Sequence, residues 1–107
     1  MYNIHMQNSN EHIGFEWDSN KAERNFLKHD VTFESAAHAF SDMFARVVPD
    51  LRHSDYEERF FLIGMDLSSR VLTVCYCERK EGMVIRIISA RKATKKESEQ
   101  YWRYRNE

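Results

Sequence analysis

The chain has 107 residues, of which 42% are hydrophobic, 13% aromatic and 31% charged, and its formal net charge is −1. With three Gly and one Pro, this composition excludes fibrous and low-complexity classes and favours one folded domain with one core. No apolar run approaches the roughly 20 residues that a membrane-spanning helix needs, and residues 1–12 lack the blocks of a signal peptide. We expect a cytoplasmic protein without a membrane partner, with a flexible arm over residues 1–12 and a single domain over residues 13–107.

The small net charge hides an asymmetry between the two halves. Residues 1–58 carry 11 acids and 5 bases, which gives −6, whereas residues 59–107 carry 11 bases and 6 acids, which gives +5. A basic half on a nearly neutral protein suggests an anionic partner for that half, although charge runs are more often solvated faces.

The first third of the chain predicts a short strand followed by two helices. Residues 13–17 alternate and are aromatic, and Asp18 is a good N-cap for a helix over residues 19–29, in which Ala22, Phe26 and Leu27 fall at helical spacing. Asp30 would take the left-handed C-cap position. Thr32 can cap a second helix over residues 33–40.

After residue 43 the period changes to that of strands. Residues 44–49 predict an edge strand that ends at the only proline, and residues 50–56 a polar loop. Strands over 58–65, 71–79 and 84–91 follow, joined by short turns, and the one over 71–79 is apolar on both faces and therefore central. Thr94 and Glu97 form a capping box that opens a C-terminal helix. The sequence predicts an α+β fold: an antiparallel sheet, made of a four-strand meander and a short N-terminal strand, packed with two N-terminal helices and a C-terminal helix.

Cys75 and Cys77 lie two apart on the predicted central strand. Positions i and i+2 share a face of a strand, and two residues so close on one strand are poorly placed for a mutual disulfide. Without a second Cys or His pair nearby they are also a weak metal signal. We interpret both as buried small residues.

The last strand raises a question, because an apolar run carries two arginines. Strict alternation would put Arg91 on the face of Ile85 and Ile87, and Arg86 on the other face. On a sheet covered on both faces, such charges need a carboxylate, a groove or a phosphate. Hairpin pairing would bring the ends of neighbouring strands together, so we expect Arg59, Arg79 and Arg86 to cluster around the carboxylate of Glu78.

These residues also carry a resemblance. The run F-E-W-D-x-x-K-x-x-x-N-x-x-K-H spans residues 15–29, D-x-x-H-S spans 50–54, and R-I-I-S-A-R-x-A-T-x-x-E spans 86–97, with the pairs Glu58-Arg59 and Glu78-Arg79 between them. Over about residues 13–101 the chain resembles the BrnT family, toxins of type II toxin–antitoxin modules with a RelE-like ribonuclease fold. The chain departs from the family at Asp30, where Gly is usual, which touches a helix cap at a cost of about 1 kcal/mol.

The resemblance implies a bacterial enzyme that cleaves RNA and blocks translation. A BrnA-type antitoxin with a ribbon-helix-helix part would neutralise it, and the complex would contact operator DNA only through the antitoxin. Such a ribonuclease needs no metal: the 2′-hydroxyl attacks the adjacent phosphate, a base takes its proton, cations stabilise the phosphorane, and an acid gives a proton to the 5′-oxygen as its bond to phosphorus breaks.

The candidate catalytic residues follow from this chemistry. Arginine is always charged and pairs with phosphate through two donors, so we assign the scissile phosphate to Arg59, Arg79, Arg86 and Arg91. Glu78 would orient them or act as the base. His53 would act as base or acid, since the pKa of histidine lies near neutrality.

Three further cations are candidates for contacts to the RNA substrate: Lys28, His29 and Lys92. For each candidate a structural role stands beside the functional one. Arg86 and Arg91 can form ion pairs with Glu78 or with a helix acid, His53 can be an exposed loop residue, and Lys28 and His29 can complete a helix C-terminus.

The chain has no Gly-rich phosphate loop, no H-E-x-x-H and no nucleophile elbow. No cofactor or metal is therefore expected. The alternative to an enzyme is a non-catalytic module that uses the same basic surface to bind nucleic acid or to dock an antitoxin.

Overall fold

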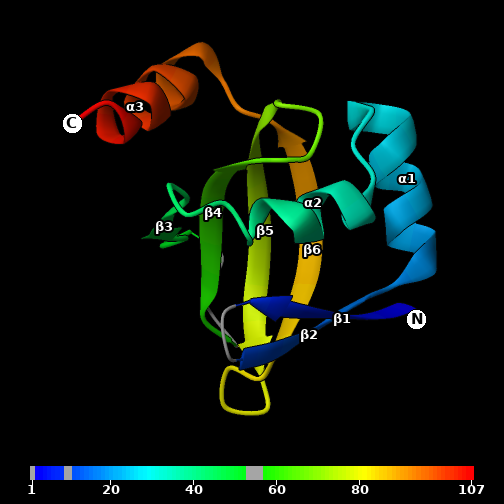
Figure 1. Ribbon diagram of the computed structural model, residues 1–107. Coiled ribbons are helices and arrows are strands. Elements are labelled where there is room, and N and C mark those ends of the chain that lie inside the picture. Colours follow the sequence, from blue (N-terminus) through cyan, green and yellow to red (C-terminus); the bar gives the residue numbers. More distant parts are fainter. Residues whose placement is uncertain (1, 9–10, 53–56) are drawn as a thin grey trace.

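The computed structural model describes residues 2–8, 11–52 and 57–107. Over these residues the chain forms a six-stranded sheet in the order β1-β2-β6-β5-β4-β3, with three helices (Figure 1). The elements in chain order are β1 Tyr2–Asn8, β2 Glu11–Trp17, α1 Ser19–His29, α2 Phe33–Ala39, β3 Arg46–Pro49, β4 Arg59–Met65, β5 Val71–Arg79, β6 Val84–Lys92 and α3 Lys95–Arg105.

The N-terminal segment, for which the sequence predicted a flexible arm, contains a strand. Tyr2–Asn8 forms strand β1, which pairs antiparallel with β2 from Tyr2 opposite Trp17 to Asn8 opposite Glu11. The letters of this segment alternate between apolar and polar residues as a strand requires.

The sheet is mixed, which corrects the expectation of an antiparallel sheet. Neighbours β3, β4, β5 and β6 pair antiparallel in chain order. Strand β2, however, pairs parallel with β6 over Gly14 to Glu16 opposite Val84 to Arg86. A parallel neighbour needs a long crossover connection, and here the connection contains every element from α1 to β5.

Helix α1 has the predicted ends but not the predicted buried face. Asp18 accepts hydrogen bonds from the backbone N–H groups of Asn20 and Lys21 at 2.8 and 3.3 Å, and Asp30 is left-handed with φ of 58°. Phe26 and Leu27 are nevertheless 46% and 77% exposed, and the buried residue of the helix is Asn25. This helix is anchored by polar contacts, which apolar spacing does not reveal.

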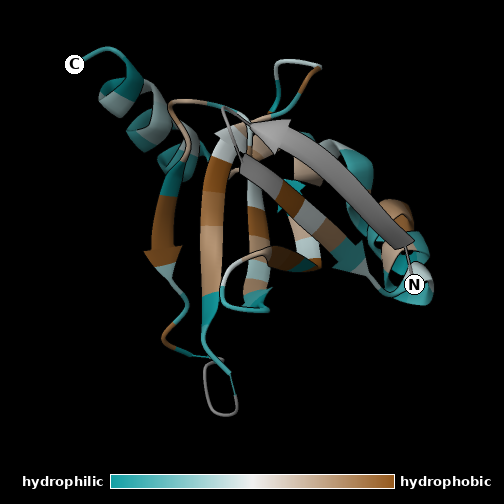
Figure 2. Ribbon diagram, turned by 60° about the horizontal axis from the view of Figure 1, so that its bottom comes forward, coloured by the Kyte–Doolittle hydropathy of each residue, from teal (hydrophilic) through white to brown (hydrophobic). Residues whose placement is uncertain are grey.

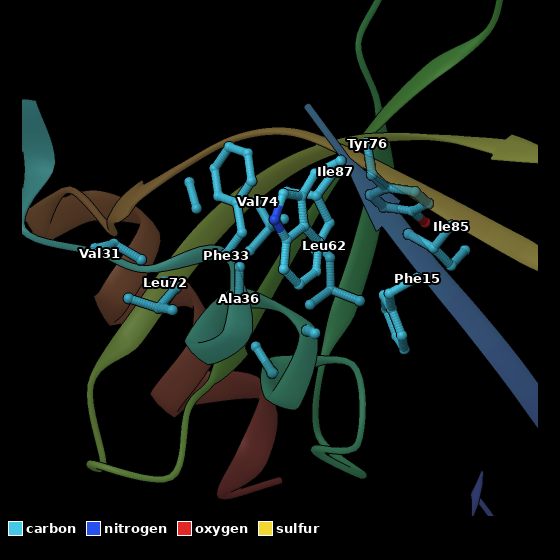
Figure 3. Close-up of a cluster of buried hydrophobic side chains, with 14 residues drawn as sticks. Phe15, Val31, Phe33, Ala36, Leu62, Leu72, Val74, Tyr76, Ile85 and Ile87 are labelled. Carbon is cyan, nitrogen blue, oxygen red and sulfur yellow. The ribbon is translucent and has the colours of Figure 1, made fainter. Parts of the chain in front are cut away.

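The core lies between α2 and one face of the sheet, as Figure 3 shows. Phe33 and Ala36 of α2 are fully buried and belong to the same cluster as Leu62, Val74 and Ile87 of three neighbouring strands. Thr32 caps α2 by accepting a hydrogen bond from the Ser35 N–H. The α2 side of the sheet is called the helix face below.

Helix α3 lies at the end of the sheet and is mostly hydrophilic (Figure 2). The predicted capping box is present between Thr94 and Glu97. One buried aromatic anchors the helix, since the Tyr101 hydroxyl donates to Asp42 at 2.6 Å. Within the described residues no helix is both long and apolar enough to cross a membrane.

Candidate active site

A β-bulge in β6 determines which arginines share a face. Cys75 of β5 is opposite Ser89, but the next residue, Tyr76, is opposite Ile87, so Ile88 is one extra residue in β6. Arg86 and Arg91 are opposite Cys77 and Thr73, which are four residues apart on β5. The two arginines therefore share one face, and the prediction that they lie on opposite faces is wrong.

This face, opposite α2, carries a row of residues in register across four strands. Arg59 of β4 is opposite Cys77 of β5, Cys77 is opposite Arg86 of β6, and Arg86 is opposite Glu16 of β2. Residues directly opposite each other point to the same side of a sheet. We call this side the arginine face. Two arginines flank the buried Cys77 on it, at Cα positions about 10 Å apart.

A third arginine joins the row from the same strand as Cys77. Arg79 lies two positions further along β5, hence on the same face. Its Nη2 forms an ion pair with Glu57 Oε2 at 3.2 Å, and its side chain hydrogen-bonds Cys77, which raises the pKa of Arg79. The expected cluster of Arg59, Arg79 and Arg86 is therefore present at one end of the arginine face.

The carboxylate expected at the centre of this cluster is elsewhere. Glu78 is opposite Ile85, a core residue, so its side chain belongs to the helix face. Burial raises the pKa of Tyr76 to about 12, and the charge of Glu78 adds to that effect. The prediction that Glu78 orients the arginines is therefore wrong, because adjacent strand residues point to opposite faces.

Glu16 holds Arg86 instead. The Nη1 of Arg86 donates to Glu16 Oε2 at 3.2 Å, and the two side chains are 23% and 20% exposed. Glu16 was not predictable as the partner of Arg86, because no local pattern indicates that β2 pairs with β6. Glu57 was predictable, because it precedes Arg59 by two positions and alternate residues of an extended chain point to the same side.

Asp50 is a third acidic residue near the arginines. It is 4% exposed, and its backbone N–H donates to the Arg59 carbonyl at 2.8 Å. Its carboxylate accepts from the Arg52 N–H at 3.2 Å. Burial raises the pKa of Cys75 to about 11, and the charge of Asp50 adds to that effect. The start of the 50–56 segment therefore lies beside the arginine face.

Arg91 is held by a helix acid, as the structural interpretation allowed. Its Nη1 and Nη2 donate to the two carboxylate oxygens of Glu97 at 2.7 and 3.1 Å. Glu97 also closes the capping box and accepts from the Thr73 hydroxyl at 2.9 Å. These hydrogen bonds lower the pKa of Glu97 to about 2, and the largest effect comes from Arg91. Arg91 thus joins the arginine face to the start of α3.

The remaining candidates are spread out. Lys28 and His29 border a shallow depression between α1 and β6. Lys92 is exposed at the end of β6, opposite the core residue Leu72, so it points away from the arginine face. His53 lies outside the described residues.

The geometry defines a class of protein: a small α+β domain that carries four arginines on one face of its sheet, three of which form ion pairs with acidic residues. Residues 17–97 match the family model for "Ribonuclease toxin, BrnT, of type II toxin-antitoxin system". The match covers most of the chain, which therefore belongs to the BrnT family of ribonuclease toxins, and its class implies an RNA substrate and an antitoxin partner.

The comparison with solved structures agrees on the fold. The chain is similar to the Brucella abortus ribonuclease toxin BrnT, known from a 1.1 Å crystal structure, with a TM-score of 0.58 and 23% sequence identity. The similarity covers 76% of this chain and 96% of the Brucella chain. A search of curated proteins finds no match.

Proposed function

We propose that the chain cleaves single-stranded RNA without a metal, at the arginine face, and that Arg59, Arg79 and Arg86 bind the scissile phosphate. The observation that carries this proposal is the position of the three arginines next to Cys77 on one face of the sheet. In the transition state the phosphorane gains negative charge, and fixed donors aimed at developing charge are usually the largest contribution to catalysis.

The acidic partners fit this role because they hold the arginines before the substrate arrives. Glu16 contacts Arg86 and Glu57 contacts Arg79, each through a nitrogen–oxygen distance of 3.2 Å. A guanidinium has five N–H donors in a planar fork. An arginine oriented by one carboxylate oxygen presents its planar group in a defined direction, which two-point recognition of a phosphate requires.

Proton transfer is assigned to His53, which follows Asp50 by three positions in a segment that starts beside the arginine face. A histidine near its ordinary pKa can take the proton of the 2′-hydroxyl or give one to the leaving 5′-oxygen. Glu78 is not part of this proposal, because its side chain lies on the helix face.

The cellular part of the proposal rests on the family. The chain blocks translation in the bacterial cytoplasm, is related in fold to RelE-like ribonucleases, and is neutralised by a BrnA-type ribbon-helix-helix antitoxin that carries the DNA contacts of the complex. We assign no catalytic role to residues 1–12 or to the surface that binds the antitoxin.

The test is cleavage of a labelled RNA by the purified chain in EDTA, with Arg86→Lys and Arg86→Ala made in parallel. Lysine keeps the charge but loses the planar fork. We expect both variants to bind RNA within a few-fold of the parent and to lose about 100-fold in kcat, the scale of one lost transition-state donor.

Arg103→Ala, on the exposed side of α3, removes the same charge away from the site and should cleave like the parent. Cleavage that EDTA abolishes and Mg²⁺ restores would show that metal independence is wrong. RNA binding without cleavage, with and without added ribosomes, would favour the non-catalytic alternative. Full activity of Arg86→Lys would remove the fork from the mechanism.

A further inference from the structure

Helix α1 lies along the edge of β6 that faces away from β5, where no described strand pairs with β6 beyond Arg86. Strand β2 pairs with β6 only at residues 84–86. Further along, the buried side chain of Asn25 replaces a neighbouring strand: it donates to the Ala90 carbonyl at 2.8 Å and accepts from the Ala90 N–H at 3.0 Å. A third bond, to the Val31 carbonyl at 3.0 Å, ties the amide to the end of the helix.

This anchor fixes which side of α1 lies against the sheet edge. With about 100° per residue, Lys21, Lys28 and His29 lie within about 60° of Asn25, and Arg24 lies about 100° from it. We call these four residues the basic stripe. They border a shallow depression whose other wall is Ile88 and Ser89 of β6. Ser89 is exposed and opposite Cys75, so it belongs to the arginine face.

The stripe is not neutralised by ion pairs with the described residues. The one acid of α1, Glu23, neighbours Lys21 and Arg24 at i+2 and i−1, positions that do not face each other on a helix. Asp18 is close enough for Lys21 and Arg24 to help lower its pKa, but its carboxylate accepts chiefly the N–H groups of Lys21 and Asn20. Among the described salt bridges, none includes a residue of the stripe.

We propose that the basic stripe is a second subsite, which binds the sugar–phosphate backbone of single-stranded RNA flanking the scissile bond. This inference rests on the proposed function for the position of the scissile bond. The bulge places Ser89 and Arg86 on one continuous surface, with Cα positions about 10 Å apart along β6. A strand cleaved at the arginines would reach the stripe within a few nucleotides.

The chemistry of the depression favours a polyanion over a protein partner. Protein interfaces have an apolar core in which charged residues are depleted, whereas this depression is lined mainly by cations and polar groups, with Ile88 as its one aliphatic residue. Binding to it should be electrostatic, independent of base sequence and sensitive to salt.

The test uses Lys21→Gln, Arg24→Gln and Lys28→Gln combined, since glutamine keeps helix propensity. The matched control is Lys95→Gln, Lys96→Gln and Arg103→Gln on α3, which has the same charge change at exposed positions. Each protein is assayed on a 12-nucleotide RNA and on a dinucleotide with one phosphodiester bond, and the affinity for the longer RNA is measured against salt.

We expect the stripe variant to bind the 12-nucleotide RNA about tenfold more weakly, with a salt slope reduced by about 2, because each single-strand phosphate contact contributes roughly 0.7. Its cleavage of the dinucleotide should be unchanged, and the control should behave like the parent. Equal losses in the stripe variant and the control, or no loss in either, would overturn the subsite. If the parent binds RNA without cutting it and the stripe variant alone weakens binding, the subsite stands and the proposed ribonuclease activity falls.

Discussion

At the start of α3, we expect the loss of Glu97 to reduce the stability of the fold most. Its carboxylate accepts four hydrogen bonds: two from Arg91 at 2.7 and 3.1 Å, one from the Thr73 hydroxyl at 2.9 Å and one from the Thr94 N–H at 2.8 Å. Glu97→Gln keeps one acceptor oxygen and removes the charge. The variant can still cap the helix, but it cannot hold both nitrogens of Arg91.

The size of the effect lies between two limits. Hydrogen bonds to charged groups contribute about 1.5–3 kcal/mol, whereas fully exposed ion pairs contribute about 0–1 kcal/mol. The side chains of Arg91 and Glu97 are 37% and 24% exposed, so solvent screens the pair only in part. We expect a loss of about 1.5 kcal/mol, which for a domain of this size lowers Tm by roughly 5–10 °C.

The effect should depend on pH in one direction. The pKa of Glu97 is about 2 in the folded protein, below its ordinary value of 4.5. A depressed carboxyl pKa stabilises the fold above the unfolded pKa, and this stabilisation is lost as pH falls through the folded pKa. The stability difference between parent and variant should therefore be complete at pH 6, roughly halved near pH 3 and absent below pH 2.

The assay is urea unfolding at pH 6 and pH 3, followed by tryptophan fluorescence. Glu99→Gln is the control, because it removes the same charge from an exposed position two residues further along α3 and should change stability by less than about 0.5 kcal/mol. A difference between parent and Glu97→Gln that is the same at both pH values would refute the role of the charged carboxylate. A Glu97→Gln protein as stable as the parent at pH 6 would refute the pairing itself.

Two further substitutions test the packing that positions the site. Asn25→Ala leaves the Ala90 N–H and two carbonyls without their side-chain partner, so it should cost about 3 kcal/mol and speed hydrogen exchange of the Ala90 amide, whereas unchanged exchange would contradict the edge contact. Gly64→Ala would place a Cβ 2.9 Å from the Ala39 carbonyl oxygen, a backbone atom that cannot swing away, so urea unfolding should show a loss of about 1–3 kcal/mol; a neutral result would mean that α2 shifts freely on β4.

Features set by neighbouring residues were predictable from the sequence. Asp18, Asp30 and Thr32 take the predicted cap positions, and the Thr94–Glu97 capping box is present. The central, buried β5 also follows from a run that is apolar on both faces. In each case the interactions that determine the feature lie within a few residues, so the local sequence predicts it.

Features set by distant partners were not predictable. The pairing of β2 with β6 joins Glu16 to Arg86 across 70 positions, and no local pattern announces it. The burial of Asn25 and the exposure of Phe26 and Leu27 follow from the free edge of β6, which exists only because β2 stops pairing at Arg86. Strand β1 was not predicted for a related reason: a short alternating segment forms a strand only when another strand pairs with it, and the sequence does not show that pairing.

The arginines show how one irregularity determines the site. Arg86 and Arg91 are five residues apart, an odd spacing that strict alternation assigns to opposite faces. The extra residue Ile88 changes the effective spacing to an even number, so both side chains reach the arginine face. The apolar strand accommodates these two charges because each arginine forms an ion pair with an acid from another element: Glu16 from β2 and Glu97 from α3. The bulge both gathers the cations and brings Ser89 to the surface between them and α1, so the same extra residue shapes the proposed catalytic cluster and the route to the basic stripe.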